Sequence, residues 1–134
     1  LTLTVSEPQA RLGSTVSVTV AGENVTDLFS APLRLKFDPK VLRLNEVTRG
    51  DFFARDGQNV IFTRNIQNDV GEVAVNLNRM PGTGGMSGSG TLITLVFQTV
   101  APGPSVITVL DAPLKNSKLE PVNLPAPETA IIVK

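Results

Sequence analysis

The side chains that most enzymes use as nucleophiles and general bases are missing from this chain. Its 134 residues include no histidine and no cysteine. A Ser-His-Asp triad, a Cys-His dyad and nearly all transition-metal sites are therefore excluded. The remaining route to catalysis is a carboxylate pair, but no two acidic residues share a strand face in an apolar setting. We predict that the chain is not an enzyme and holds no cofactor.

Two turns carry oxygen-bearing side chains that could attract calcium. They comprise Asn65, Asn68, Asp69 and Glu72 at one turn, and Asp51 and Asp56 at the other. Calcium takes about six to eight oxygen ligands, and neither turn has the D-x-[DN]-x-[DN]-G spacing of an EF-hand loop. We therefore interpret both as solvated turns and predict no metal site.

The glycine-rich segment PGTGGMSGSG, residues 81–90, has the most biased composition. As a phosphate-binding loop it lacks the Gly-Lys-Ser/Thr ending and the helix that should follow. The dinucleotide-binding spacing also fails, because the third glycine would stand at position 87, which is serine. We interpret the segment as a mobile loop between strands.

The tripeptide Arg49-Gly50-Asp51 spells an integrin-binding sequence, but Phe52 and Phe53 follow it at once. Matches of three residues are frequent by chance, and two adjacent aromatic rings favour burial. We interpret this segment as a structural turn that packs the two rings.

The overall composition excludes several classes of partner. Lysine plus arginine equals aspartate plus glutamate at 12 each, so no charge excess favours nucleic acid or an anionic membrane. No apolar run approaches the roughly 20 residues that span a bilayer, so we predict no direct membrane insertion. Tryptophan and tyrosine are absent, which removes the usual rings for stacking sugars or bases.

Turn signals recur about every ten residues, with short β-rich runs between them, as in an all-β sandwich. We predict nine strands in one domain that spans residues 1–134. The strands are Leu1–Val5, Thr15–Ala21, Ala31–Phe37, Val41–Thr48, Asn59–Asn65, Glu72–Arg79, Thr91–Val100, Ser105–Leu110 and Thr129–Lys134. The only helical candidate is a single turn near Asn24 to Phe29.

Alternation of apolar and polar residues predicts which side chains face the core. The predicted core residues are Leu35, Phe37, Val75, Leu77, Leu95 and Phe97, with Val16, Val18 and Leu44 around them. A phase slip after Leu44 predicts a β-bulge near Asn45. The nearly continuous apolar run in 91–100 predicts a central strand that is covered on both faces.

Four segments, taken in order, resemble the cohesin domain family over nearly the whole chain. They are LGSTVSVTV at 12–20, LRLKFDPKVLRLNEVTRGDFF at 33–53, NDVGEVAVNL at 68–77 and SGTLITLVFQTV at 89–100, and a final strand after the proline-containing loop, within 121–134, also fits. The resemblance implies a nine-stranded, two-sheet sandwich of jelly-roll topology. It also implies a protein-docking module whose partner is a dockerin-like protein.

The resemblance further implies that the partner meets the sheet formed by the third, fifth, sixth and eighth strands. Carried over residue by residue, the outward positions on that sheet are Arg34, Lys36, Thr63, Asn65, Asn76, Asn78, Val106 and Thr108. The phase of the fifth strand is ambiguous, because Val60, Ile61 and Phe62 are all apolar.

The segments NVTDLFSAPLRLKFDP, GDFF and SGSGTL resemble the cohesin-like domains appended to bacterial secretins of type II secretion and type IV pilus systems. This implies an exported module that is periplasmic, associated with the outer membrane or extracellular, with a secretion-system component as the alternative protein partner. A carbohydrate-binding module, related to cellulose-binding sandwiches, stays open as the alternative function, although it lacks the usual aromatic platform.

Overall fold

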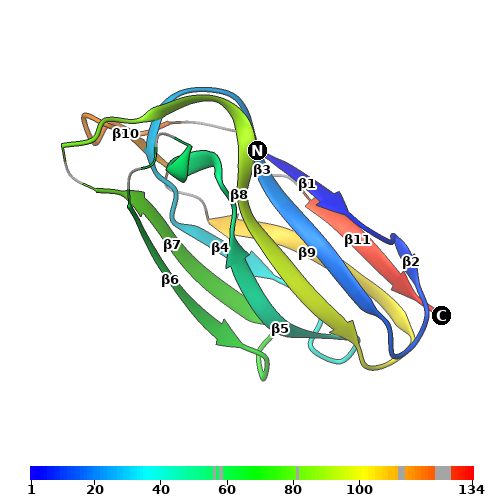
Figure 1. The fold of residues 1–134 in the computed structure, drawn as a ribbon. Helices are drawn as coiled ribbons and strands as arrows, with labels where there is room; N and C mark the ends of the chain where they lie inside the picture. The colour runs from blue at the N-terminus through cyan, green and yellow to red at the C-terminus, as the bar shows by residue number, and fades with distance from the viewer. Residues whose placement is uncertain (56, 58, 81, 112–113, 123–127) are drawn as a thin grey trace.

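The computed structural model describes residues 1–55, 57, 59–80, 82–111, 114–122 and 128–134 (Figure 1). Strands build two facing layers, and the only helical element in the described residues is the short 3-10 helix η1, Phe52–Ala54. One layer has the order β1-β3-β8-β5, with the bounds Thr2–Val5, Thr15–Ser30, Met86–Thr99 and Leu42–Arg49. The chain is thus all-β, as predicted.

The second layer has the order β2-β11-β9-β4-β7-β6. The bounds of these strands are Gln9–Ala10, Glu128–Val133, Gly103–Asp111, Leu33–Lys36, Glu72–Arg79 and Val60–Gln67. Strand β10, Lys115–Asn116, pairs with the end of β3. All nine predicted strands are present, and the order of their neighbours is that of a jelly roll.

Two further features complete the layers. The short β2 pairs in parallel with β11, and the N–H groups of Ile132 and Lys134 donate to the carbonyls of Pro8 and Ala10. The last residue of β3, Ser30, pairs with Asn78 of β7, so hydrogen bonds run from one layer into the other.

The helical turn predicted near Asn24 to Phe29 is wrong, because β3 continues to Ser30. Asn24 and Asp27 adopt left-handed φ values of 50° and 53°, which asparagine and aspartate tolerate better than most residues. Each coincides with a shift in register against β8, so the strand absorbs extra residues as bulges and stays paired. The loop predicted over 81–90 is wrong from Met86 onward for the same reason, since 86–90 pair with β3. Position 81 lies outside the described residues.

The core fills the space between the layers, as the alternation predicts. All nine predicted core residues are at most 2% exposed. Phe37 and Phe97 meet edge to face across the layers, with ring centroids 5.1 Å apart. Phe52 and Phe53 are also buried, which confirms the structural-turn interpretation of the segment before them.

The bulge predicted in β5 is confirmed, whereas the prediction that β8 is covered on both faces is only partly correct. The predicted bulge at Asn45 is confirmed by a register shift between Leu44 and Glu46. Strand β8 is central, between β3 and β5, but the side of β8 that points away from the core is only partly covered, since Thr94 and Val96 are half-buried. Leu92 and Ile93 are both buried because the pairing with β3 skips Leu92.

Candidate functional site

The four strands predicted to carry the binding residues lie side by side in the second layer. They follow the order β9-β4-β7-β6, and their ladders are antiparallel (Figure 1). We call their solvent-facing side the outer face. It is built by alternation: Leu33 and Leu35 of β4 turn into the core, so Arg34 and Lys36 turn outward.

Strand register brings the predicted site residues together on this face. Thr63 pairs with Asn76, and Asn65 is joined through Ala74 to Arg34. Lys36 pairs with Thr108 of β9. Six of the eight predicted residues are exposed, whereas Asn78 and Thr108 are half-buried.

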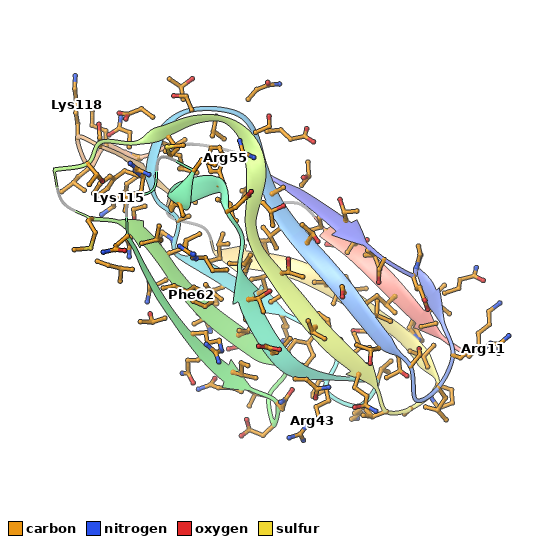
Figure 2. The ribbon with its side chains drawn as sticks, viewed as in Figure 1. Arg11, Arg43, Arg55, Phe62, Lys115 and Lys118 are labelled. Atoms are coloured by element: carbon orange, nitrogen blue, oxygen red, sulfur yellow. The ribbon has the colours of Figure 1, made fainter. Side chains whose placement is uncertain are left out.

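The ambiguous phase of β6 is resolved by its packing. Val60, Phe62 and Ile66 pack against the core, whereas Ile61 and Thr63 are exposed. Figure 2 shows Phe62 directed from β6 toward the interior of the sandwich. The outward assignment of Thr63 and Asn65 is therefore supported by the neighbours on either side of them.

The charged groups of the outer face are partly paired. An Arg34 guanidinium nitrogen lies 3.1 Å from a Glu72 carboxylate oxygen. Lys36 is in neither of the two ion pairs found among the described residues, so its ammonium is available to a partner. The Ser30 hydroxyl donates to the amide oxygen of Asn78, which fixes that side chain and explains its partial burial.

Apolar side chains that the sequence reasoning did not assign also reach this face. Ile61 of β6 is 42% exposed, and Leu110 of β9 is 44% exposed at a bulge against β4. Val106, which was predicted, is 48% exposed. Near Val106, a pocket of about 430 Å³ opens between Lys36, Pro39 and Pro104. The face therefore mixes apolar area with charged and amide groups.

A buried arginine organises the end of the molecule where β7 finishes. Arg79 is 1% exposed. Its Nε donates to the carbonyl of Gly84 at 2.6 Å, and its terminal nitrogens donate to the carbonyls of Phe53 at 2.5 Å and Thr83 at 3.3 Å. One side chain thus fixes both η1 and the loop before β8.

Asp27 organises the same end from β3. Its carboxylate accepts hydrogen bonds from the Ser117 hydroxyl at 2.6 Å and from the Gly85 N–H at 3.0 Å. The Ser117 hydroxyl is the main cause that lowers the pKa of Asp27 below its usual value, and desolvation opposes it. Asp27 therefore joins β3 to the loop before β8 and to the turn after β10.

The turn that could have attracted calcium is used differently. Asn68 Nδ2 donates to the Leu44 carbonyl and its Oδ1 accepts from the Leu44 N–H, while Glu72 pairs with Arg34. Among the described residues, no three acidic side chains gather where a metal ion could sit. Asp56, from the second candidate turn, lies outside the described residues. None of the helical structure described is long and apolar enough to cross a membrane.

Three solved structures share the fold at low sequence identity. A non-cellulosomal cohesin from the archaeon Archaeoglobus fulgidus is 20% identical, with a TM-score of 0.81 over 99% of this chain and 90% of that one. The cohesin of a type I cohesin–dockerin complex from Clostridium thermocellum is 19% identical, with a TM-score of 0.81 over 98% and 97%. The sixth cohesin of scaffoldin B from Acetivibrio cellulolyticus, in complex with a dockerin, is 21% identical, with a TM-score of 0.80 over 98% and 97%.

No curated protein sequence is significantly similar to the chain. The family model of the cohesin domain, in contrast, matches residues 1–114. That match covers every strand from β1 to β9, and so all four strands of the outer face. The chain therefore belongs to the cohesin domain family, whose members are non-catalytic modules that dock other proteins.

Proposed function

We propose that this domain binds a dockerin through the outer face of β9-β4-β7-β6 and catalyses no reaction itself. The observation that carries the proposal is the continuity of this face in a member of the cohesin family. Exposed Arg34, Lys36 and Asn76 lie on adjoining strands beside the apolar Val106 and Ile61. A standard protein interface buries roughly 800 Å² on each side and combines apolar area with about ten hydrogen bonds.

The carbohydrate-binding alternative finds no support in the aromatic residues. All six phenylalanines are described, and none is exposed: Phe29 and Phe62 are half-buried, and the other four are buried. Glycan platforms use large exposed rings. A protein partner is therefore the better match to this surface.

We infer that the module works outside the cytoplasm, because cohesins are typically extracellular or cell-surface modules. The narrower setting, in the periplasm or at the outer membrane, follows from the resemblance to domains appended to secretins. In that setting the partner would be a component of the secretion system rather than a dockerin.

The test is calorimetric titration of the domain with purified type I and type II dockerins, in buffer that contains calcium. The double variant Arg34→Glu, Asn76→Ala is expected to bind at least about tenfold more weakly, because it reverses one charge and removes one amide on the outer face. Its melting temperature should stay close to that of the wild type, since both side chains are exposed.

The matched control is Arg43→Glu, Gln98→Ala. Arg43 and Gln98 are exposed partners on β5 and β8, in the opposite layer, so this variant makes the same chemical changes on the other side of the sandwich. Equal losses of affinity in both variants would show that the outer face is not the binding surface. If every dockerin fails to bind, the partner is of another class.

A further inference from the structure

The turn after β10 displays a leucine in an unfavourable conformation. Leu119 has a φ of 62°, in the left-handed region that a leucine side chain disfavours. Asn116 holds the turn: its side-chain oxygen accepts from the N–H groups of Lys118 and Glu120, and its carbonyl accepts from the N–H of Leu119. Leu119 is nevertheless 63% exposed, the most exposed large apolar residue described.

This combination costs the free domain stability twice, through the backbone and through the exposed apolar surface. Glycine at this position would remove the cost of the left-handed φ, and a polar side chain would remove the cost of the exposed apolar surface. Strain of this kind persists where the surrounding structure holds it, as Asn116 does here, and it clusters at binding and active sites. Strain and exposure together make Leu119 the starting point for a binding hypothesis.

Leu119 forms one wall of a pocket of about 410 Å³. Its other lining residues are Phe29, Gly82, Gly84 and Ser117. Two hydrogen bonds hold the walls in place. Arg79 donates to the Gly84 carbonyl, and Asp27 accepts from the Ser117 hydroxyl. Gly82 and Gly84 have no atom within 4 Å of the point where a Cβ would stand, so their backbone is open.

Two lysines lie close in the chain to the residues that line this pocket. Lys118 stands between the lining residues Ser117 and Leu119 in the chain, and Lys115 stands two residues before Ser117; both lie at the end of the molecule opposite Arg11 (Figure 2). Neither ammonium belongs to an ion pair among the described residues. The nearby acids accept hydrogen bonds within the chain, from Ser117 and Gly85 for Asp27 and from the amide nitrogen of Asn116 for Glu120. Besides the Ser117 hydroxyl, Lys118 also helps to lower the pKa of Asp27 through its charge.

Strand pairing connects the end of the molecule that carries this pocket with the outer face. Strand pairing forms one row across four strands, from Lys115 to Ser30, from Ser30 to Asn78, and from Asn78 to Ile61. Asn78 and Ile61 belong to the outer face, and Phe29 of the pocket precedes Ser30. A protein on the outer face that extends past the end of β7 therefore approaches the end of the molecule where the pocket lies.

We propose that this pocket binds a leucine-sized aliphatic side chain adjacent to a carboxylate, presented by the same protein partner that covers the outer face. The inference rests on the proposed function for the identity of the partner. The aliphatic group replaces water against Phe29 and Leu119, and the carboxylate lies toward Lys115 and Lys118. Leu119 then recovers in the complex the burial that it lacks in the free domain.

The first test uses two dipeptide probes, N-acetyl-Leu-Glu amide and N-acetyl-Leu-Lys amide, titrated into ¹⁵N-labelled domain. We expect saturable amide shifts at Gly82, Gly84, Ser117 and Leu119 with the glutamate probe, and at least about threefold weaker binding of the lysine probe. Added salt should narrow that difference. Equal binding of the two probes, or the absence of saturable shifts at these residues, would overturn the proposal.

The second test separates function from stability. Leu119→Gly should bind the glutamate probe at least about fivefold more weakly while its melting temperature stays equal to or above that of the wild type. The control is Leu12→Gly, which changes another exposed leucine, one without a left-handed φ. It should lower the melting temperature and leave probe binding unchanged. A melting temperature of Leu119→Gly below that of the wild type, with unchanged probe binding, would contradict the inference.

With a dockerin that binds the domain, the two proposals fail separately. Affinity that falls on changing the outer face but not in Leu119→Gly would refute the pocket and keep the proposed function. Probe binding at the pocket, with every dockerin failing to bind, would refute the dockerin partner and keep the pocket.

Discussion

Asn68 and Leu44 are joined by a reciprocal pair of hydrogen bonds that links the two layers of the sandwich. The Leu44 N–H donates to Asn68 Oδ1 at 2.8 Å, and Asn68 Nδ2 donates to the Leu44 carbonyl at 3.0 Å. The primary amide thus completes the backbone pairing of β5 at its outer edge, where the bulge at Asn45 begins. An asparagine in the β6–β7 turn therefore satisfies backbone groups of an edge strand in the opposite layer.

Replacing Asn68 by alanine should lower the free energy of unfolding by about 1–3 kcal/mol, because it removes both hydrogen bonds from a partly buried backbone segment. Urea denaturation measures the change. Asp69→Ala, in the same turn but exposed, is the control and should cost under about 0.5 kcal/mol. Similar losses in the two variants would mean that the Asn68 pair adds little.

Replacing Phe97 by alanine should cost about 3–5 kcal/mol, because it empties a fully buried site and removes the edge-to-face contact with Phe37. Chemical denaturation at equilibrium gives the value. Val100→Ala, near the end of the same segment and exposed, should change stability by under about 0.5 kcal/mol. A loss under about 1 kcal/mol for Phe97→Ala would contradict the packing described.

Replacing Arg79 by lysine should destabilise the domain although it keeps the charge. A lysine ammonium cannot reproduce the fork of donors that serves the carbonyls of Phe53, Thr83 and Gly84. The expected loss is about 2–4 kcal/mol, with faster amide hydrogen exchange in η1 and in the loop before β8. Arg49→Lys, on the exposed face of β5, is the matched control. Unchanged exchange in η1 and in the loop before β8 would show that neither depends on the Arg79 guanidinium.

Replacing Asp27 by asparagine should make the stability of the domain less sensitive to a fall in pH. Hydrogen bonding from Ser117 lowers the pKa of Asp27 from its usual value of 3.8. A lowered pKa in the folded state adds stability above pH 3.8 that is lost as the pH falls through the folded-state pKa. Asparagine keeps the size of the side chain and tolerates the left-handed φ, but it carries no titrating proton.

Melting temperatures recorded between neutral pH and pH 2.5 test this prediction. The wild type should exceed Asp27→Asn at neutral pH, and the difference should shrink below pH 3.8. A difference that stays constant over this range would show that the charge of Asp27 contributes nothing. Asp51→Asn, on an exposed residue, serves as the control for the loss of one negative charge.

The sequence predicts best where a strand is covered on one face only. Period-two alternation in β4 and β7 fixes the exposed Arg34, Lys36 and Asn76, because one buried face selects the register. The same alternation that turns Val73, Val75 and Leu77 inward also turns Arg79 inward. The pattern therefore predicts a buried arginine, although its charge argues for an exposed one. On β6, an apolar triplet gave no period, and only its packing resolves the phase.

Other features depend on contacts between residues far apart in the chain. Nothing near Asp27 reveals that Ser117 is its partner, since 90 residues separate them. The bulges at Asn24 and Asp27 look like turns in the sequence, and pairing with β8 overrides that local preference. The pocket beside Leu119 likewise combines three separate segments, so neither its walls nor its strained leucine could be found from one stretch of sequence.

The parallel pairing of β2 with β11 also sets how the domain responds to mechanical load. Tension that enters through the chain before β2 and leaves after β11 pulls two parallel neighbours in opposite directions along their length. The hydrogen bonds from Ile132 to Pro8 and from Lys134 to Ala10 then share the force. They must rupture together in shear rather than open one after another as in a zipper, so this short strand pair acts as a clamp along the pulling direction.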